Sequence, residues 1–405
     1  MGQGGTSRHP GPGRRAPLTP ATHVDSAPSC RRAATSVGDA RAAAAEIRAQ
    51  LGVGPHALVL AFVSPERDRQ ACAEALQEEF PGVAVLGCTT AGEIGPDGVA
   101  SGTVTAAALP AGAFTVAHGV IEDVRQVGIV ECRELVQRLR AELVGRGAEV
   151  TPTTTFAMLL VDGLSGAEEV VASALNSALG DIGLVGGSAG DGLRFEQTHV
   201  FADGRAFGRG AVLALVHTQL PFTLFKTQHF VPGERRLVVT GADSSRRIVH
   251  EIDGEPAARH FAEVLGMHEH DLDPIVFATN PVVVRIGGSD YVRSIQKVDP
   301  DGSLTFYCAI EEGIVLRDAR GIGLQQNLAE ALDGLVARIG EPSLTITFDC
   351  ILRGLECQRD DKVDEVSRLL RGANCVGFST YGEQFHGMHI NQTLTGVAFG
   401  CGVVG

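Results

Sequence analysis

The chain has 405 residues, with 34 basic and 48 acidic side chains and a formal net charge of −14. Hydrophobic residues make up 44% of it and charged residues 20%, a balance that excludes general disorder and is typical of globular proteins. The acidic excess argues against a nucleic-acid-binding surface, which is usually basic. No apolar run reaches the roughly 18–20 residues of a membrane-spanning helix, so we expect no membrane insertion.

The nine cysteines are widely spaced, and no two of them form a C-x-x-C pair. An odd number at such spacing argues against both a disulfide framework and a zinc site. We therefore expect free and mostly buried thiols, no bound metal, and a cytoplasmic protein.

The first 36 residues differ from the rest of the chain. They hold five prolines, five arginines and a single acid, Asp25, and they show no hydrophobic periodicity. This composition predicts a disordered basic leader over residues 1–36. Neither of its arginine pairs is followed by an apolar segment, so we do not expect an export signal.

A pattern of secondary structure then recurs three times along the chain. Each copy is predicted to hold a helix, a strand, a second helix, a second strand, a glycine turn and a third strand. The predicted first strands span 57–63, 155–161 and 344–351, and they are nearly continuous apolar runs, as in strands covered on both faces. Strands that alternate with helices predict an α/β fold of layered sheets, built from these repeated units and divided into two domains.

The segment between the second and third copies, about 220–320, does not follow the repeat. It holds strand-like stretches, a helix that ends at Gly266, and a hairpin that joins 291–298 to 304–310 across a Pro-Asp-Gly turn. We place the start of a second domain here. The predicted domains are an N-terminal α/β domain over 37–250 and a C-terminal domain over 251–405.

The three glycine turns, at 87–93, 186–191 and 377–383, carry similar polar residues. Ligands usually bind at strand ends in α/β folds, and three similar turns are expected to face one pocket. The alternative is that the hydroxyls and acids hydrogen-bond to the turn backbone. The candidate ligand-binding residues of the turns are Thr89, Thr90, Glu93, Ser188, Asp191, Ser379, Tyr381 and Glu383.

Tyr291 and Arg293 lie two residues apart on the predicted hairpin and so share one face of it, and Glu311 follows its second strand. Arg293 is a candidate clamp for a ligand carboxylate, and the alternative is an internal ion pair with a glutamate. The hydroxyls and N–H groups of the turns would also hold a carboxylate, while the turn acids would accept from an ammonium group. Together these residues predict an amino-acid-like ligand.

Two further motifs point to other chemistry. The segment 186–190 matches the G-x-S-x-G pattern of hydrolases, but no helix is predicted after it, so a serine hydrolase that uses Ser188 is a remote alternative. His386 and His389 are the candidate ligands if haem is bound. The chain has no phosphate-binding loop, dinucleotide-binding motif or zinc-protease motif, and we predict no catalytic residue.

Several of these segments resemble the FIST domain, a bacterial sensory module. Its N-terminal part resembles residues 57–63, 87–93 and 184–191, and its C-terminal part resembles residues 291–293, 311–313, 377–383 and 391–395. The last segment adds Asn391 to the candidate ligand-binding residues. The resemblance implies a non-enzymatic signal-transduction protein that binds a small ligand between two α/β domains and acts on a partner such as a histidine kinase. It also implies an alternative, a haem-dependent nitric-oxide sensor that regulates a histidine kinase; otherwise we expect no cofactor.

Overall fold

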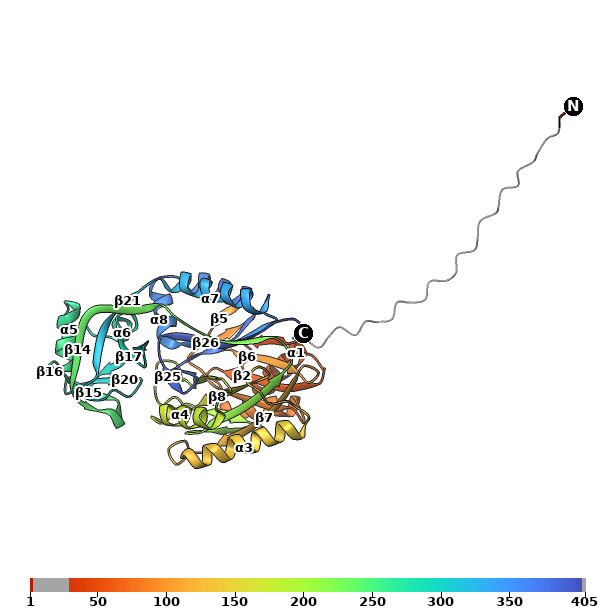
Figure 1. Cartoon of the computed structure of the whole chain (residues 1–405), viewed down its shortest axis with the longest axis horizontal. Helices are drawn as coiled ribbons and strands as arrows, with labels where there is room; N and C mark the ends of the chain where they lie inside the picture. The colour runs from red at the N-terminus through yellow and green to blue at the C-terminus, as the bar shows by residue number, and fades with distance from the viewer. Residues whose placement is uncertain (3–28, 403–405) are drawn as a thin grey trace.

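The computed structural model describes residues 1–2 and 29–402, and it consists of a core of three similar sheets and one inserted β-rich unit (Figure 1). The inserted unit lies at one end of the molecule, where its strands β14, β15, β17, β20 and β21 gather with helices α5 and α6. This arrangement confirms the predicted mixed α/β fold. None of the helices in the described residues has both the length and the apolar character needed to cross a membrane.

The first copy of the repeat forms the sheet β1-β6-β2-β3, which two strands of another copy extend. Strands β2 and β3 are parallel and are connected through helix α2, while β6 returns antiparallel beside β2. The elements of this copy are β1 (Arg31–Thr35), α1 (Ala40–Leu51), β2 (His56–Val63), α2 (Arg69–Glu79), β3 (Ala84–Thr89) and β6 (Val104–Pro110).

Strand β1 shows that the predicted leader was too long at its C-terminal end. Residues 31–35 form an edge strand that pairs with β6, and Ala33 in it is fully buried. The segment is short, and alanine and arginine are not typical strand residues, so its composition did not reveal it. Residues 3–28 of the predicted leader lie outside the described residues.

The second and third copies repeat this arrangement in the sheets β7-β12-β8-β9 and β13-β26-β22-β23. In both, the first two strands are parallel and the returning strand is antiparallel to the first. The second copy comprises β7 (Phe114–Ile121), α3 (Ile129–Gly145), β8 (Thr155–Val161), α4 (Glu168–Leu179), β9 (Leu184–Ser188) and β12 (Ala211–Thr218). The third comprises β13 (Phe222–Gln228), α7 (Leu324–Ile339), β22 (Leu344–Cys350), α8 (Ile351–Arg359), α9 (Val363–Gly372), β23 (Cys375–Thr380) and β26 (Thr393–Phe399).

After each glycine turn a short hairpin leaves its own copy and extends the sheet of a neighbouring copy. Hairpin β4–β5 of the first copy pairs with β23, β10–β11 of the second pairs with β3, and β24–β25 of the third pairs with β9. This cyclic exchange ties the three copies into one core. The hairpin strands are β4 (Glu93–Gly95), β5 (Gly98–Ala100), β10 (Val200–Ala202), β11 (Arg205–Phe207), β24 (Glu383–Phe385) and β25 (Met388–Ile390). The sequence did not reveal them, because strands of three residues carry too little periodicity.

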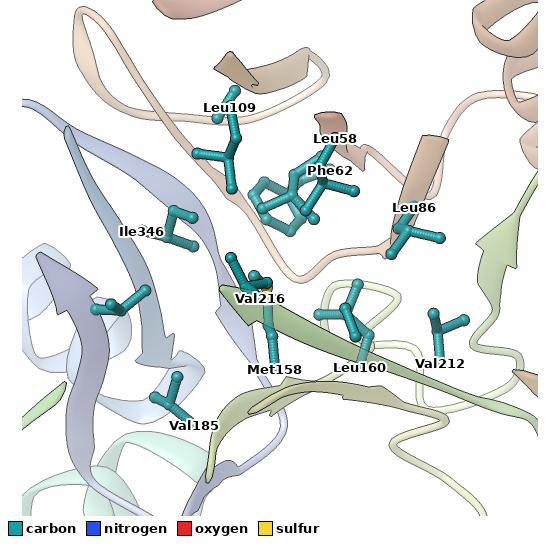
Figure 2. Close-up of a cluster of buried hydrophobic side chains, with 14 of the residues drawn as sticks. Leu58, Phe62, Leu86, Leu109, Met158, Leu160, Val185, Val212, Val216 and Ile346 are labelled. Carbon is teal, nitrogen blue, oxygen red and sulfur yellow. The ribbon is translucent and has the colours of Figure 1, made fainter. Parts of the chain in front are cut away.

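The inner faces of the three sheets share one hydrophobic core (Figure 2). Leu58 and Phe62 of β2 meet Met158 and Leu160 of β8 and Ile346 of β22 there. The alternate residues of β2 face the other way and pack beneath the helices of their own copy. Both faces of each first strand are therefore covered, which explains the nearly continuous apolar runs.

The first glycine of each turn motif is required by close packing. A Cβ at Gly87, Gly186 or Gly377 would lie only 1.8–2.0 Å from a carbonyl oxygen of the neighbouring parallel strand. The position therefore excludes every other residue, and the repeated glycine reflects close approach of two backbones.

The inserted unit is built on one sheet with the strand order β18-β17-β21-β14-β15-β20-β19, and it has its own core around Val239, Phe261 and Phe277. The predicted hairpin is present as β19–β20, but residues 291–293 belong to the preceding strand β18, which pairs with β17. The elements are β14 (Phe230–Asp243), η1 (Ser244–Arg246), β15 (Ile248–Ile252), β16 (Glu255–Pro256), α5 (Ala257–Leu265), η2 (Glu269–Asp271), α6 (Pro274–Thr279), β17 (Val282–Ile286), β18 (Ser289–Arg293), β19 (Ile295–Val298), β20 (Leu304–Phe306) and β21 (Val315–Gly321).

The packing units do not coincide with the predicted division at 250/251. Residues 324–399, which we assigned to the C-terminal domain, complete the three-copy core together with strands from 31–228. Strand β13, just after the change of pattern near 220, still belongs to the core; the insertion begins with β14, and the chain returns to the core after β21.

Candidate functional site

The three glycine turns meet at the centre of the core through backbone hydrogen bonds. The N–H groups of Ala91, Ser188 and Gly190 donate to the carbonyl groups of Ser379, Gly382 and Thr89, at 2.9, 2.8 and 3.0 Å. Each turn is thereby joined to both of the others. The three turns therefore converge, as the sequence predicted.

Glu93 and Glu383 occupy equivalent positions in two turns and make the same contacts. Glu93 accepts hydrogen bonds from the N–H and hydroxyl groups of Thr103 at 3.0 and 2.8 Å, and Glu383 accepts the same pair from Thr393 at 3.2 and 2.6 Å. Each also accepts from the threonine hydroxyl three residues earlier. Burial raises the pKa of Glu383 to about 8 and also raises the pKa of Glu93. Both acids are thus used to hold their own turns.

Asp191 in the second turn is also bound by its own loop. Its carboxylate accepts from the N–H groups of Phe195, Glu196 and Gln197, each at 2.8 Å, and from the hydroxyl of Tyr381. Thr89 exchanges hydrogen bonds with the backbone of His199. These contacts correspond to the backbone-bonding alternative for the polar turns.

Ser188 lacks the surroundings of a nucleophile. It is fully buried, and its hydroxyl oxygen lies 2.8 Å from the amide nitrogen of Gln384, which donates to it. Within the described residues no histidine contacts this hydroxyl, and strand β9 ends at Ser188 without a helix directly after it. No general base therefore contacts the Ser188 hydroxyl within the described residues, and the geometry does not support the serine hydrolase alternative.

The remaining predicted residues of the hairpin lie apart from the turns. The ring of Tyr291 lies beneath the ammonium group of Lys226, 4.9 Å from the ring centre, and Glu311 is exposed in a turn. Arg293 is 6% exposed and donates to the carbonyl of Val292 at 3.2 Å. Among the described residues Arg293 has no ion-pair partner, so the internal Arg293–glutamate pair is not formed.

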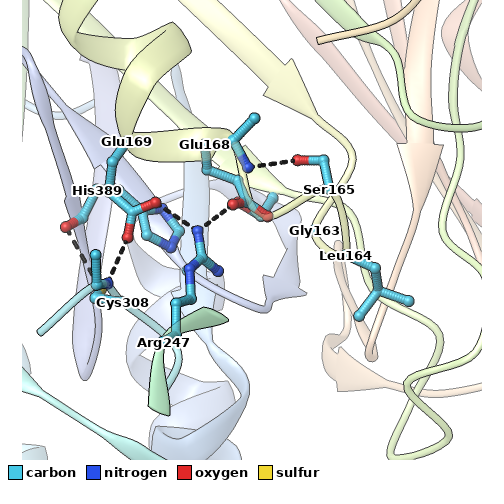
Figure 3. A network of polar contacts seen from close by, with 12 residues as sticks. Gly163, Leu164, Ser165, Glu168, Glu169, Arg247, Cys308 and His389 are labelled. Atoms are coloured by element: carbon cyan, nitrogen blue, oxygen red, sulfur yellow. Dashed lines mark hydrogen bonds and ion pairs between the residues drawn. The ribbon is translucent and has the colours of Figure 1, made fainter. Parts of the chain in front are cut away.

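A different group of side chains meets at the junction between the core and the inserted unit (Figure 3). Glu168 and Glu169 come from the first turn of α4, and His389 comes from hairpin strand β25. Arg247 follows η1, and Cys308 follows β20, both in the inserted unit. Segments more than 200 residues apart in the sequence therefore contribute to one cluster.

The charges of this junction cluster are paired across the two units. The guanidinium of Arg247 donates to the carboxylates of both Glu168 and Glu169. Burial lowers the pKa of Arg247, but the two glutamates more than offset this and raise it. The N–H of Ala309 donates to Glu169 at 2.9 Å. Both acids also lie at the positive end of the α4 dipole, which favours their ionised form.

His389 and Cys308 sit beside Glu169 in this cluster. Burial raises the pKa of Cys308 to about 12 and lowers the pKa of His389, so at neutral pH both are uncharged. The thiol of Cys308 donates to the side-chain oxygen of Asn391 at 2.9 Å. The Nδ1 atom of His389 lies 3.1 Å from the amide nitrogen of Gln384. Burial raises the pKa of Glu169, but attraction to the charged forms of His389 and Arg247 outweighs burial, so the pKa is lowered overall. At pH 7 Arg247 is the charged partner.

Three buried polar atoms of this region lack a partner within the described residues. They are one carboxylate oxygen of Glu168, the amide oxygen of Gln384 and the amide nitrogen of Asn391. Buried polar atoms are nearly always satisfied by protein, water or a bound group, so these three atoms are expected to contact a water or a bound group.

A cavity of about 170 Å³ opens at this junction. The core lines it with the loop 163–166, Tyr381 and His389, and the inserted unit lines it with polar residues that include Arg246, Arg247 and Thr305. A second cavity of about 170 Å³ lies between the first and third turns and α8, where Ser379 and Asp349 border a mostly apolar wall. Of these two cavities in the described part of the chain, the one at the junction brings together charged and hydroxyl groups from both units.

The surroundings of the two candidate haem ligands do not fit a haem. His386 lies at the tip of hairpin β24–β25 with its ring packed against Phe385, and it borders none of the cavities described above. His389 borders the junction cavity, whose polar lining and small volume are unlike the large apolar pocket that a haem requires.

The fold and the site together define a class of protein in which three α/β copies carry an inserted unit and enclose a polar cavity at the junction. The chain belongs to the FIST family: the FIST N domain matches residues 57–255, and the FIST C domain matches residues 257–386. FIST domains are associated with sensory signal transduction and with ligand binding. No curated protein matches the chain.

Sequence reasoning identified only part of the junction. Tyr381, Asn391 and His389 were candidate residues, and the structure brings them to or beside the cavity. Arg247, Cys308 and the two glutamates of α4 were missed. A pair of acids at a helix start is a common capping feature, and an isolated cysteine carries no motif, so no sequence signal distinguished them.

Proposed function

We propose that this protein is a non-enzymatic sensor that binds a small, amino-acid-like ligand in the junction cavity. The observation that carries the proposal is the lining itself, because exposed Arg246 and uncharged Tyr381, Thr305 and Gln296 surround a space of about 170 Å³. A cavity of this small volume suits a ligand of amino-acid size.

The charges at the cavity favour a ligand with a carboxylate. Arg247 is already neutralised by Glu168 and Glu169, whereas Arg246 has no ion-pair partner among the described residues. Arg246 is therefore the guanidinium free to bind a carboxylate, and the side-chain amide of Gln296, which makes no hydrogen bond among the described residues, would orient the rest of the ligand.

A ligand at this position would contact both packing units at once. Its binding would favour one arrangement of the inserted unit relative to the core, and a signalling partner such as a histidine kinase would respond to that arrangement. We propose that the output runs through such a partner in the cytoplasm.

The test is calorimetric binding of amino acids and small carboxylates to the full chain. The ligand found should bind at least tenfold more weakly to Arg246→Ala, because a hydrogen bond to a charged group contributes about 1.5–3 kcal/mol. Arg41→Ala is the matched control, since Arg41 is exposed on the first copy, where it pairs only with Glu78. Equal binding by Arg246→Ala and the parent, or no binding of any of these compounds, would overturn the proposal.

A further inference from the structure

The side chains of Glu169, Cys308 and His389 converge at the junction, and Figure 3 shows them turned toward one another. One ligand-type atom of each lies within 4.8 Å of those of the other two, namely a carboxylate oxygen, the thiol sulfur and a ring nitrogen. Carboxylate, thiolate and imidazole are the three ligand types that zinc binds in proteins. We propose that these three residues form a zinc site that joins the inserted unit to the core.

The position of His389 suits a metal ligand. Its Nδ1 faces the Gln384 side chain, and within the described residues Nε2 has no hydrogen-bond partner. Ligating histidines usually donate their other ring N–H to an oxygen, which fixes the ring. The unpartnered amide oxygen of Gln384 supplies such an acceptor when the amide is turned by half a rotation, because amide orientation is assigned from the hydrogen-bond network.

The side-chain amide of Asn391 can likewise hydrogen-bond to Cys308 before and after a metal binds. Its amide oxygen now accepts from the thiol at 2.9 Å, while its amide nitrogen is buried without a partner in the described residues. Zinc binding requires the thiolate, so the proton of Cys308 passes to solvent as the metal–sulfur bond forms. The same half rotation of the Asn391 amide then places its N–H group against the thiolate as a donor.

The local charge also tolerates a dication. Glu168 and Glu169 pair with Arg247, and the charge of Arg293, unpaired within the described residues, acts on Cys308 and His389, so these four charges sum to zero before the metal binds. A zinc ion together with the Cys308 thiolate adds one positive charge to the site. Glu168, which shares Arg247 with Glu169, still has one carboxylate oxygen without a partner in the described residues. Three protein ligands leave the fourth position of a tetrahedral ion open.

This site was not foreseen from the sequence, where cysteine spacing predicted no metal. The three residues come from α4, from hairpin strand β25 and from the inserted unit, so only the tertiary structure brings them together. The proposal stands independently of the ligand in the neighbouring cavity.

The experiment uses the full chain with Cys401→Ser, which removes an exposed thiol. After chelator treatment the protein is titrated with Co²⁺ alone and then with Zn²⁺ alone. We expect one Co²⁺ per chain, a near-ultraviolet thiolate-to-cobalt absorption band, displacement of Co²⁺ by one equivalent of Zn²⁺, and a melting temperature raised by several degrees. Cys308→Ser should abolish the band, and Glu169→Gln and His389→Gln should weaken Zn²⁺ binding at least tenfold.

Cys132→Ser is the control, because Cys132 lies on the buried face of α3, in the core of the second copy and away from the junction. The proposal fails if the parent shows no thiolate band, or if a folded Cys308→Ser variant retains it. If that variant does not fold, X-ray absorption of the cobalt-loaded parent decides: one sulfur ligand supports the site, and a shell of nitrogen and oxygen alone overturns it.

Discussion

The buried acids of the glycine turns and those of the junction differ in how their hydrogen bonds are used. Glu93 and Glu383 have all their hydrogen-bond partners within their own copies of the repeat, whereas Glu168 and Glu169 reach across to Arg247 and leave one carboxylate oxygen without a partner in the described residues. The turn acids recur because the repeat needs them to close each turn. The junction acids depend on an inserted unit that the repeat does not contain. Recurrence of a polar residue in an internal repeat is thus evidence for structure before it is evidence for function.

The largest expected effect tests the turn acids. Glu383→Ala leaves three buried donors of Thr380 and Thr393 without an acceptor, so we expect the free energy of unfolding to fall by about 4 kcal/mol. Urea denaturation measures it. Glu93→Ala should cost a similar amount, since its contacts are the same. A loss below about 1 kcal/mol for both variants would show that these acids do not hold the turns.

A pH dependence follows from the buried carboxyl of Glu383. Burial raises its pKa in the folded protein to about 8, above the ordinary value near 4.5, so the folded state binds the proton more tightly. Stability should therefore be greatest below about pH 4.5 as far as this group is concerned, and should fall as the pH rises to 8, by up to about 4 kcal/mol. Denaturation between pH 5 and pH 8 should show a weaker decline for Glu383→Gln than for the parent. Identical slopes would contradict the shifted pKa.

Breaking the junction pairs should have a smaller effect. Arg247→Met leaves Glu168 and Glu169 without their cation, and we expect a loss of about 2 kcal/mol, because Arg247 and Glu169 are partly exposed and screened by solvent. Hydrogen exchange should increase first at the start of α4 and around 304–308. Arg246→Met is the matched control and should leave the exchange unchanged. Uniform destabilisation of the core would show that the junction is not a separate unit of stability.

The smallest effect is expected at Tyr381, which belongs to both regions. Its hydroxyl donates to Asp191 in the second turn, and its ring lines the junction cavity. Tyr381→Phe should lower the free energy of unfolding by about 1 kcal/mol. Tyr291→Phe is the control, because the Tyr291 hydroxyl has no hydrogen bond among the described residues. If the control destabilises as much as Tyr381→Phe, the Asp191 contact contributes nothing of its own.

The ligand-binding role of the candidate residues stays a prediction, but the structure shows where those of the repeat lie. The three turns converge as predicted, and Tyr381, His389 and Asn391 lie at or beside the junction. The turn hydroxyls and acids were assigned to a ligand because a sequence shows which polar groups recur but not what they bond to. Their ligand-binding role stays a prediction, while their hydrogen bonds within the turns are visible.

The sequence by itself determined the three α/β copies, because a strand that is buried on both faces consists almost entirely of apolar residues, as in 57–63. It also determined the turn glycines, since Gly87, Gly186 and Gly377 each face a neighbouring backbone. The tertiary structure alone decided the exchange of hairpins, the return of residues 324–399 to the core, and the meeting of Glu169, Cys308 and His389. Local periodicity reports which face of an element is buried, but contacts between residues more than 80 positions apart depend on how whole elements pack, and no short-range pattern encodes that.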